Sequence, residues 1–172
     1  FKTQSDTEVI LQYYKLYGSK CFDFFEGMWS IAIYDRRKKT LILSRDRFGE
    51  KPLYYYKSNY GLFFGSEIKF IKSLVKKEKF QVNNKKISDF LQFGHRAPYL
   101  DNKTFFNNIY KLEPGNYLKI DKKLKIFRHK YWNYSIKKET KDNFKTILKK
   151  TKKIFNRTLR MQLRADVPIA LL

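Results

Sequence analysis

Residues 27–55 read GMWSIAIYDRRKKTLILSRDRFGEKPLYY, and this stretch decides the fold. A first apolar run ends at Asp35, a polar turn occupies residues 36–39, and a second apolar run extends from Thr40 to Arg45. Two short runs rich in Ile, Leu and Tyr on either side of polar residues are typical of an antiparallel β-hairpin. The pattern therefore predicts strands over residues 28–35 and 40–45.

Outside this hairpin, further short elements are expected on both sides. Residues 52–56 and 62–65 predict a second strand pair, with a turn at 58–61. Upstream, apolar residues at helical spacing predict a helix over 5–17, with Ser5 or Asp6 as its cap. The pattern of hairpins and short helices indicates a layered α+β domain.

The downstream part changes in character near residue 135. Short helices are predicted over 67–75 and 88–93, the latter capped by Ser88, and loops with short strands over 98–134. A long amphipathic helix is predicted over about 141–163, and residues 166–172 predict a turn that enters a buried strand. We therefore divide the chain into a first domain at 1–120, a linker at 121–140 and the start of a second domain at 141–172.

Composition indicates a folded protein with a strongly basic surface. Of the 172 residues, 42% are hydrophobic and 18% aromatic, which is enough apolar material for a core. The 38 Lys and Arg against 16 Asp and Glu give a net charge of +22. Such a charge favours contact with phosphates, but the lysines are spread along the chain and no nucleic-acid motif accompanies them. We therefore expect no nucleic-acid partner, and binding of nucleic acid stays an alternative.

Cysteine content and hydropathy bear on the location of the protein. Cys21 is the one cysteine, so no disulfide can form within the chain. No apolar run of about 18 residues is present, which predicts no membrane span, and no signal peptide opens the chain. We expect a cytoplasmic protein. The sequence starts at Phe1 and stops after an apolar run without a cap, so we expect a piece of a longer protein.

Several segments together carry a resemblance to a known family. Residues 3–10, TQSDTEVI, resemble the start of the glutamine-site helix of class II glutamine amidotransferases, and residues 27–35 resemble a strand of the same enzymes. Residues 44–55, SRDRFGEKPLYY, and 65–69, GSEIK, resemble consecutive blocks of glutamine-hydrolysing asparagine synthetases. Residues 164–168, RADVP, resemble the lead into their ATP-binding loop. The segments occur in family order, and the resemblance is weakest over 76–134.

The resemblance implies a fold and a reaction for the intact enzyme. The fold is an incomplete N-terminal nucleophile (Ntn) hydrolase-like domain of four αββα layers, followed by the first helix and strand of an α/β ATP-pyrophosphatase domain. The reaction hydrolyses glutamine at a chain-initiating Cys and passes ammonia through a tunnel. The ammonia then amidates L-aspartate with ATP and Mg²⁺, giving asparagine, glutamate, AMP and diphosphate. The implied partners are glutamine, aspartate and ATP, with a homodimer as one possible assembly.

Two residues take site roles from the resemblance. Asp6 matches the carboxylate that holds the α-amino group of glutamine, an interaction that physically is a charge-assisted hydrogen bond. From the residues alone, a helix cap that complements the helix dipole is the favoured role of Asp6, and the resemblance reverses that preference. Leu172 matches a position that meets the adenine of ATP, and it equally fits a buried strand residue.

A cluster of charged residues lies in the block most similar to the family. Arg45, Asp46, Arg47, Gly49 and Lys51 contain enough cations for a phosphate site, but no glycine-rich loop opens a helix there. We expect a structural cluster of ion pairs near a domain interface instead, and we interpret Glu67 and Lys69 in the same way.

No other catalytic or metal centre is expected. Cys21 follows the first helix among phenylalanines and has no free α-amino group to act as base, so it predicts a buried thiol and not a nucleophile. His95 and His129 lack metal-ligand spacing. The family's opening Cys, its upstream glutamine contacts and its pyrophosphate loop are absent from these 172 residues. We therefore expect the chain alone to be inactive, and no ATP or Mg²⁺ to be bound fully by it.

Two further alternatives stay open at this point, one within the same class of enzyme and one outside it. One is an amide-forming enzyme of the same two-domain plan with another acceptor, such as a sugar acid or a peptide. The other is a binding module that keeps the fold without catalysis.

Overall fold

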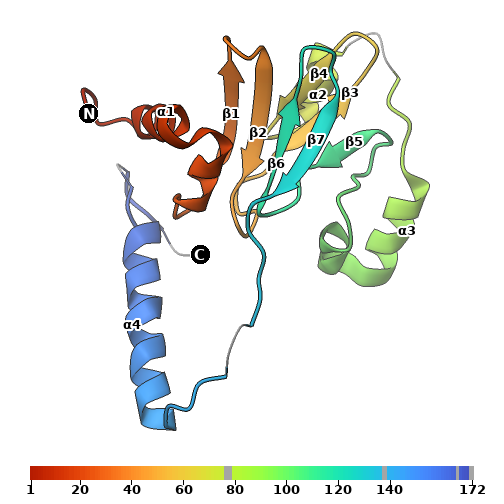
Figure 1. Cartoon of the computed structure of the whole chain (residues 1–172). Helices are drawn as coiled ribbons and strands as arrows, with labels where there is room; N and C mark the ends of the chain where they lie inside the picture. The colour runs from red at the N-terminus through yellow and green to blue at the C-terminus, as the bar shows by residue number, and fades with distance from the viewer. Residues whose placement is uncertain (76–78, 137–138, 166, 171–172) are drawn as a thin grey trace. The chain divides into compact units, whose positions relative to one another are not determined.

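A computed structural model describes residues 1–75, 79–136, 139–165 and 167–170 (Figure 1). The chain divides into two compact units, Phe1–Asn133 and Tyr134–Leu172, and each is described by itself. The expected domain limits at residues 120 and 141 stay a prediction.

The first unit alternates short helices with short strands. Its helices are α1 (Asp6–Tyr17), η1 (Gly18–Asp23), α2 (Ile68–Leu74), α3 (Asn84–Phe93) and η2 (Gly94–Tyr99), of which η1 and η2 are 3₁₀ helices. Its strands are β1 (Ser30–Asp35), β2 (Thr40–Arg45), β3 (Tyr54–Lys57), β4 (Leu62–Gly65), β5 (Ile109–Lys111), β6 (Asn116–Ile120) and β7 (Ile126–Lys130).

These strands form two antiparallel sheets. The first has the order β1-β2-β6-β7 and the second the order β4-β3-β5. The predicted hairpin at residues 27–45 is present, with Ser30 paired to Arg45 and Asp35 to Thr40. The predicted pair at 52–65 is β3 and β4, with Tyr54 paired to Gly65. Strand β6 then adds to β2, which joins the hairpin to a segment about seventy residues downstream.

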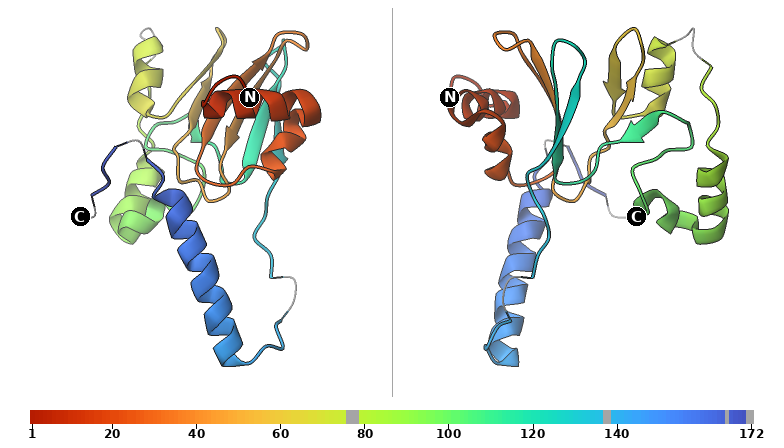
Figure 2. Two further views of the ribbon diagram at one scale, coloured as in Figure 1. Left: turned by 90° about the vertical axis from the view of Figure 1, so that its left-hand side faces the viewer. Right: turned by 45° about the vertical axis from the view of Figure 1, so that its right-hand side comes forward.

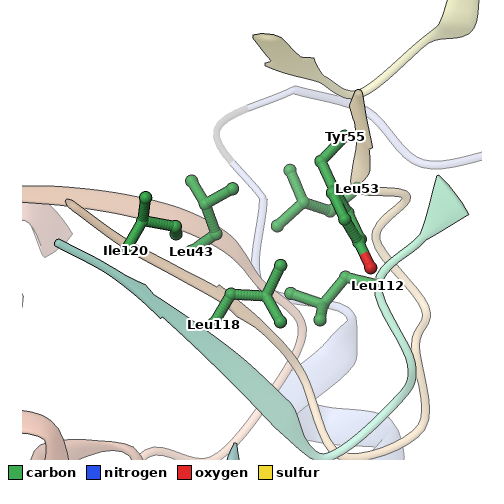
Figure 3. Packing of buried hydrophobic residues seen from close by; sticks show 6 residues of the cluster. All are labelled: Leu43, Leu53, Tyr55, Leu112, Leu118 and Ile120. Atoms are coloured by element: carbon green, nitrogen blue, oxygen red, sulfur yellow. The ribbon is translucent and has the colours of Figure 1, made fainter. Parts of the chain in front are cut away.

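The two sheets face each other across an apolar core (Figure 3). Leu43 and Leu118 of the first sheet are completely buried, and they meet Tyr55 of β3 together with Leu53 and Leu112, which adjoin the second sheet. Because alternate side chains of a strand point to opposite faces, Ile42 lies on the other side of the first sheet.

Helices cover both outer faces (Figure 2, right). Helix η1 packs Cys21 and Phe22 against Ile33 and Ile42 of the first sheet, and α1 adds partly buried residues to that cluster. On the far side, Ile71 of α2 packs against the second sheet. The layers are therefore helix, sheet, sheet, helix. This mixed α/β architecture with antiparallel sheets is consistent with the expected Ntn-like fold.

One helix begins earlier than the sequence predicted. We expected a start at Ser88, but α3 begins at Asn84, because the side chain of Asn83 accepts a hydrogen bond from the Lys86 N–H at 3.1 Å. The turn of α3 that this adds also buries Lys86, whose ammonium donates to the Ala97 carbonyl at 2.8 Å and to Asp101 at 2.7 Å. The apolar spacing was correct, and the position of the cap was wrong.

The second unit contains the predicted long helix as α4 (Phe144–Gln162). Asn143 caps it by accepting from the Thr146 N–H at 3.0 Å. The expected buried strand is not formed over residues 167–170, where Val167 and Ile169 are exposed, since a strand needs a hydrogen-bonding neighbour. Residues 166, 171 and 172 of that prediction lie outside the described residues. Within the described part of the chain, no helix is both long and apolar enough to cross a membrane.

Candidate functional site

An open hollow of about 330 Å³ lies between α1, the segment that follows η1, and the start of β1. Two carboxylic acids, several aromatic rings and aliphatic side chains line it: Asp6, Val9, Ile10, Tyr13, Phe24, Phe25, Glu26, Met28, Trp29 and Ile31. The lining contains two acids and no Lys, Arg or His. The hollow therefore favours a ligand with a cationic group and an apolar stem, and we call it the Asp6 pocket.

The start of α1 places Asp6 at the edge of this pocket. Ser5 is the cap, and its hydroxyl accepts from the Thr7 N–H at 3.2 Å. Glu8 reaches back to the preceding residues, where it accepts from the N–H groups of Lys2 and Thr3 at 2.7 and 2.6 Å. These donors, Lys2 first, lower the pKa of Glu8. The polar groups of Lys2, Thr3, Ser5, Thr7 and Glu8 thus bind one another at the start of α1.

Asp6 takes no part in these hydrogen bonds. It is the first residue of α1 and is exposed, and its carboxylate has no hydrogen-bond or ion-pair partner among the described residues. The capping role that the sequence left open for Asp6 is filled by Ser5. A negative charge at the N-terminus of a helix is favourable with the helix dipole, so the carboxylate is stable there and available to a ligand. Its role toward glutamine stays a prediction.

Aromatic rings form the apolar wall of the pocket. Tyr13 contacts Phe24 and Phe25 with centroid separations of 5.9 and 5.8 Å. Phe25 meets Trp29 edge-on at 5.7 Å and 89°. Trp29 is 8% exposed, and its indole N–H donates to the Ser44 hydroxyl at 3.3 Å. These contacts hold the wall together, and Trp29 is its most buried member.

In the expected ion-pair cluster at residues 45–51, the charged side chains bind backbone groups. Arg45 is buried and donates to the backbone carbonyls of Lys51 at 2.7 Å, Leu112 at 2.8 Å and Gly49. Asp46 is 1% exposed, and its carboxylate accepts backbone N–H groups of the loop that follows. The predicted ion pair between these two charges is not formed, because each of them binds main chain instead. The expected place near a domain interface stays a prediction.

The remaining residues of the predicted ion-pair clusters have different surroundings in the structure. Gly49 has φ +69°, and a Cβ there would lie 2.8 Å from the Arg45 guanidinium carbon, so glycine is required. Arg47 donates to the Asp23 carbonyl at 3.0 Å. Lys51 is exposed. Glu67 and Lys69 do form an ion pair, at 2.8 Å on the surface.

Cys21 is the buried thiol that the sequence predicted. It is completely inaccessible, and burial raises its pKa to about 11. A thiol that stays protonated at neutral pH is a poor nucleophile. His95 and His129 are exposed, and His129 stacks on Tyr117 at 4.8 Å. Among the residues that the structure describes, no group of three or more His, Cys, Asp and Glu could hold a metal ion.

The second predicted site residue, Leu172, lies outside the described residues. Its role toward ATP stays a prediction, and the described residues offer no test of an ATP or Mg²⁺ site. What sequence reasoning missed is the aromatic wall. The spacing of these residues gave no signal, because Tyr13 lies in α1 while Phe25 and Trp29 lie in the segment between η1 and β1, and only packing brings the two together.

Comparison with known proteins places the chain among glutamine-dependent enzymes by sequence. The family model of the glutamine amidotransferase domain matches residues 1–132. A putative glutamine-hydrolysing asparagine synthetase of Methanocaldococcus jannaschii is 34% identical over 98% of this chain and 32% of its own length. A glutamine-hydrolysing asparagine synthetase of Bacillus subtilis is 33% identical over 98% of this chain and 27% of its own length. An amidase of Gibberella zeae named chry2 is 28% identical over 99% of this chain and 25% of its own length.

The chain thus spans between a quarter and a third of the length of these curated relatives. The family match covers most of the first unit, including the Asp6 pocket and the residue 45–51 loop. It follows that the chain belongs to the glutamine amidotransferase family, with glutamine-hydrolysing asparagine synthetases among its relatives.

Proposed function

We propose that this chain forms part of a glutamine-hydrolysing asparagine synthetase and that the Asp6 pocket receives the α-ammonium group of glutamine. The observation that carries the proposal is the free Asp6 carboxylate at an apolar pocket whose lining holds no cation. An ammonium group beside such a carboxylate gains a charge-assisted hydrogen bond. The asparagine synthetase relatives support the substrate.

The pocket accounts for one end of the substrate only. The α-carboxylate of glutamine requires a cation or N–H donors, and the lining residues of the Asp6 pocket include no cation. The family resemblance assigns that contact, together with the nucleophilic Cys, to residues that these 172 do not contain. Asp6 therefore acts in binding and orientation, and the proton transfers and bond cleavage belong to other residues.

In the proposed reaction, glutamine hydrolysis supplies ammonia, and L-aspartate is amidated with ATP and Mg²⁺ to give asparagine, glutamate, AMP and diphosphate. ATP activates the aspartate carboxylate for attack by ammonia. Leu172 is the one position of this chain proposed to meet the adenine. The chain alone is proposed to be inactive toward both substrates, and the protein to be cytoplasmic.

The test uses the intact protein with glutamine, aspartate, ATP and Mg²⁺. We expect asparagine, glutamate and AMP by amino-acid analysis and ³¹P NMR. Asp6→Asn should raise the KM for glutamine by about a hundredfold, the size expected when a charged partner in a binding pocket is lost. Synthesis with added ammonium in place of glutamine should be unchanged. Absence of glutamate release by the wild type, or an unchanged glutamine KM in Asp6→Asn, would contradict the proposal.

As a second candidate we propose an enzyme of the same plan that acts on another acceptor, since one relative, from Gibberella zeae, is named an amidase and not an asparagine synthetase. Glutamate release that depends on an acceptor other than aspartate, with the same Asp6 dependence, would favour this candidate. The two candidates share the glutamine pocket and differ only in the acceptor.

A further inference from the structure

The Asp46 carboxylate connects the residue 45–51 loop to the wall of the Asp6 pocket. Its Oδ1 accepts the N–H groups of Phe48 at 3.1 Å and Glu50 at 3.0 Å. Its Oδ2 accepts the N–H of Lys51 at 3.0 Å and the N–H of Trp29 at 3.4 Å. One buried carboxylate therefore serves four backbone donors, three from its own loop and one from the residue that walls the pocket.

Trp29 is held on several sides as a result. Besides the bond to the Asp46 carboxylate, its carbonyl accepts the Asp46 N–H at 3.1 Å, so residues 29 and 46 are bonded in both directions. Its indole N–H is bonded to Ser44. Tyr131 stacks on the ring at 6.1 Å and 24°. Few conformations are left to this side chain.

A second set of bonds fixes the loop to the rest of the first unit. The Tyr131 hydroxyl donates to the Arg45 carbonyl at 2.7 Å, which ties the ring that stacks on Trp29 to the same stretch of backbone. Arg45 reaches across to Leu112, beside the second sheet, at 2.8 Å. The Asp46 carbonyl accepts the Gly115 N–H at 2.8 Å. The loop is thus anchored to both sheets, and Asp46 transmits that anchoring to Trp29.

We propose that Asp46 is a positioning residue for glutamine binding, which fixes Trp29 as the wall of the Asp6 pocket. This inference rests on the proposed function. Asp46 does not line the pocket. Its effect is exerted through the backbone of residue 29, so it governs the shape of the pocket before glutamine binds.

The substitution that isolates this role is Asp46→Asn. Asn has the same size, but its amide nitrogen cannot accept a hydrogen bond, so at least two of the four N–H donors lose their acceptor. A displaced Trp29 weakens glutamine binding. We expect the glutamine KM to rise about tenfold, as for one to two lost hydrogen bonds, while kcat changes less than about twofold because the reacting groups are untouched.

The matched control is Asp121→Asn. Asp121 also accepts backbone N–H groups within a turn, those of Lys123 and Lys125 at 2.8 and 2.9 Å, but it lies between β6 and β7 and does not line the Asp6 pocket. We expect KM and kcat to match the wild type. An Asp46→Asn enzyme with unchanged KM, or one whose kcat falls while KM stays constant, would overturn the proposal.

Should Asp46→Asn fail to fold, the variant Ser44→Ala tests whether glutamine binding depends on a fixed Trp29. It removes only the bond to the Trp29 indole and leaves the loop intact. We expect a rise in glutamine KM of about threefold, as for one neutral hydrogen bond. An unchanged KM in this variant would likewise count against the positioning role.

A readout without turnover separates this proposal from the proposed function. The intact protein is labelled with 5-fluorotryptophan, and the ¹⁹F signal of residue 29 is assigned by its loss in Trp29→Phe. Asp46→Asn should shift or broaden that signal, and Asp121→Asn should leave it unchanged. If the wild type hydrolyses no glutamine, the proposed function fails while the signal still tests the link from Asp46 to Trp29. A residue 29 signal identical to the wild type would refute the link.

Discussion

The two faces of the first sheet differ in how completely they are covered. On the inner face, Leu43 of β2 and Leu118 and Ile120 of β6 are buried against the second sheet, whereas Tyr34 of the edge strand β1 is exposed. The outer face packs Ile33 and Ile42 under η1 in the same way, but it opens toward α1 into the Asp6 pocket. The first sheet therefore contributes to the core between the sheets through β2 and β6, and to the Asp6 pocket through Ile31 of β1. Because side chains alternate along each strand, the two contributions lie on opposite faces of the sheet.

The largest expected effect on stability comes from truncating a side chain in the buried core between the two sheets. Leu118→Ala removes a completely buried side chain between the sheets. We expect the free energy of unfolding to fall by about 3 kcal/mol, from lost burial and the cavity left behind. Hydrogen exchange of peptides that cover β2 and β6, followed against denaturant in the intact protein, measures the loss.

The control makes the same change on the surface. Leu91→Ala truncates a side chain of α3 that is 80% exposed, and we expect a change within about 0.5 kcal/mol. If the two variants lost similar stability, Leu118 would not belong to a closed core between the two sheets.

The second effect belongs to the covered part of the outer face and depends on pH. Burial raises the pKa of Cys21 to about 11, and burial together with its hydrogen bond to Asp35 raises the pKa of Tyr14 to about 12. Their ordinary values are 9 and 10, so the unfolded chain loses these protons first. The contribution of these two protonated groups to the free energy of unfolding is therefore complete below about pH 9. The Cys21 part is lost as the pH rises toward 11, and the Tyr14 part as it rises toward 12.

The measurement is the unfolding free energy between pH 8 and 11. We expect a decrease on the order of 2 kcal/mol from Cys21, about two pKa units of linkage. Cys21→Ala should be less stable at pH 8 because of its smaller side chain, and its stability should fall less steeply with pH. An identical slope in the variant would show that the thiol is not buried in the folded protein.

The third effect concerns the edge of the pocket. Ser5→Ala removes the cap of α1, and we expect a loss of about 1 kcal/mol that is confined to the helix. Faster exchange of the amides at residues 7–10, with β2 unchanged, would show it. Ser73→Ala is the control, since that hydroxyl donates to the Phe70 carbonyl within the exposed side of α2 and caps nothing. Equal effects at both positions would argue against a capping role for Ser5.

The sequence predicted the parts of this fold that depend on local spacing. The hairpin of β1 and β2 and the helices α1 and α4 follow from apolar periodicity and polar turns, and the structure has all of them. Competing caps could not be ranked in the same way, and Asn83 was therefore missed in favour of Ser88. The strand expected at the end of the chain is not formed over 167–170, because a strand needs a partner that local pattern does not specify.

The candidate site likewise contains a residue that local sequence predicts, Asp6, and a residue whose role depends on distant contacts, Asp46. Asp6 was found through its resemblance to a motif within one helix start, which is local. The role of Asp46 depends on Trp29, seventeen residues away, and on Tyr131, eighty-six residues beyond Arg45. Its charge invited an ion-pair interpretation, because sequence shows which residues are charged but not which backbone N–H groups the fold brings to them.

The smallest effect on stability is expected at Asp6, and it sharpens the comparison most. Asp6→Asn removes a charge that interacts with the α1 dipole and with no described residue, so we expect a loss of about 0.5 kcal/mol or less. Asp46→Asn makes the same chemical change at a buried carboxylate with four donors, and the loss of unfolding free energy should be several times larger.

Both substitutions should weaken glutamine binding. Asp6→Asn removes the partner of the ligand's ammonium group, and Asp46→Asn lets Trp29 move in the pocket wall. Hydrogen exchange of residues 28–33 separates the two causes, since it should rise in Asp46→Asn and stay constant in Asp6→Asn. If Asp6→Asn destabilised the protein as much as Asp46→Asn did, Asp6 would be part of the fold and the pocket would lose its free carboxylate.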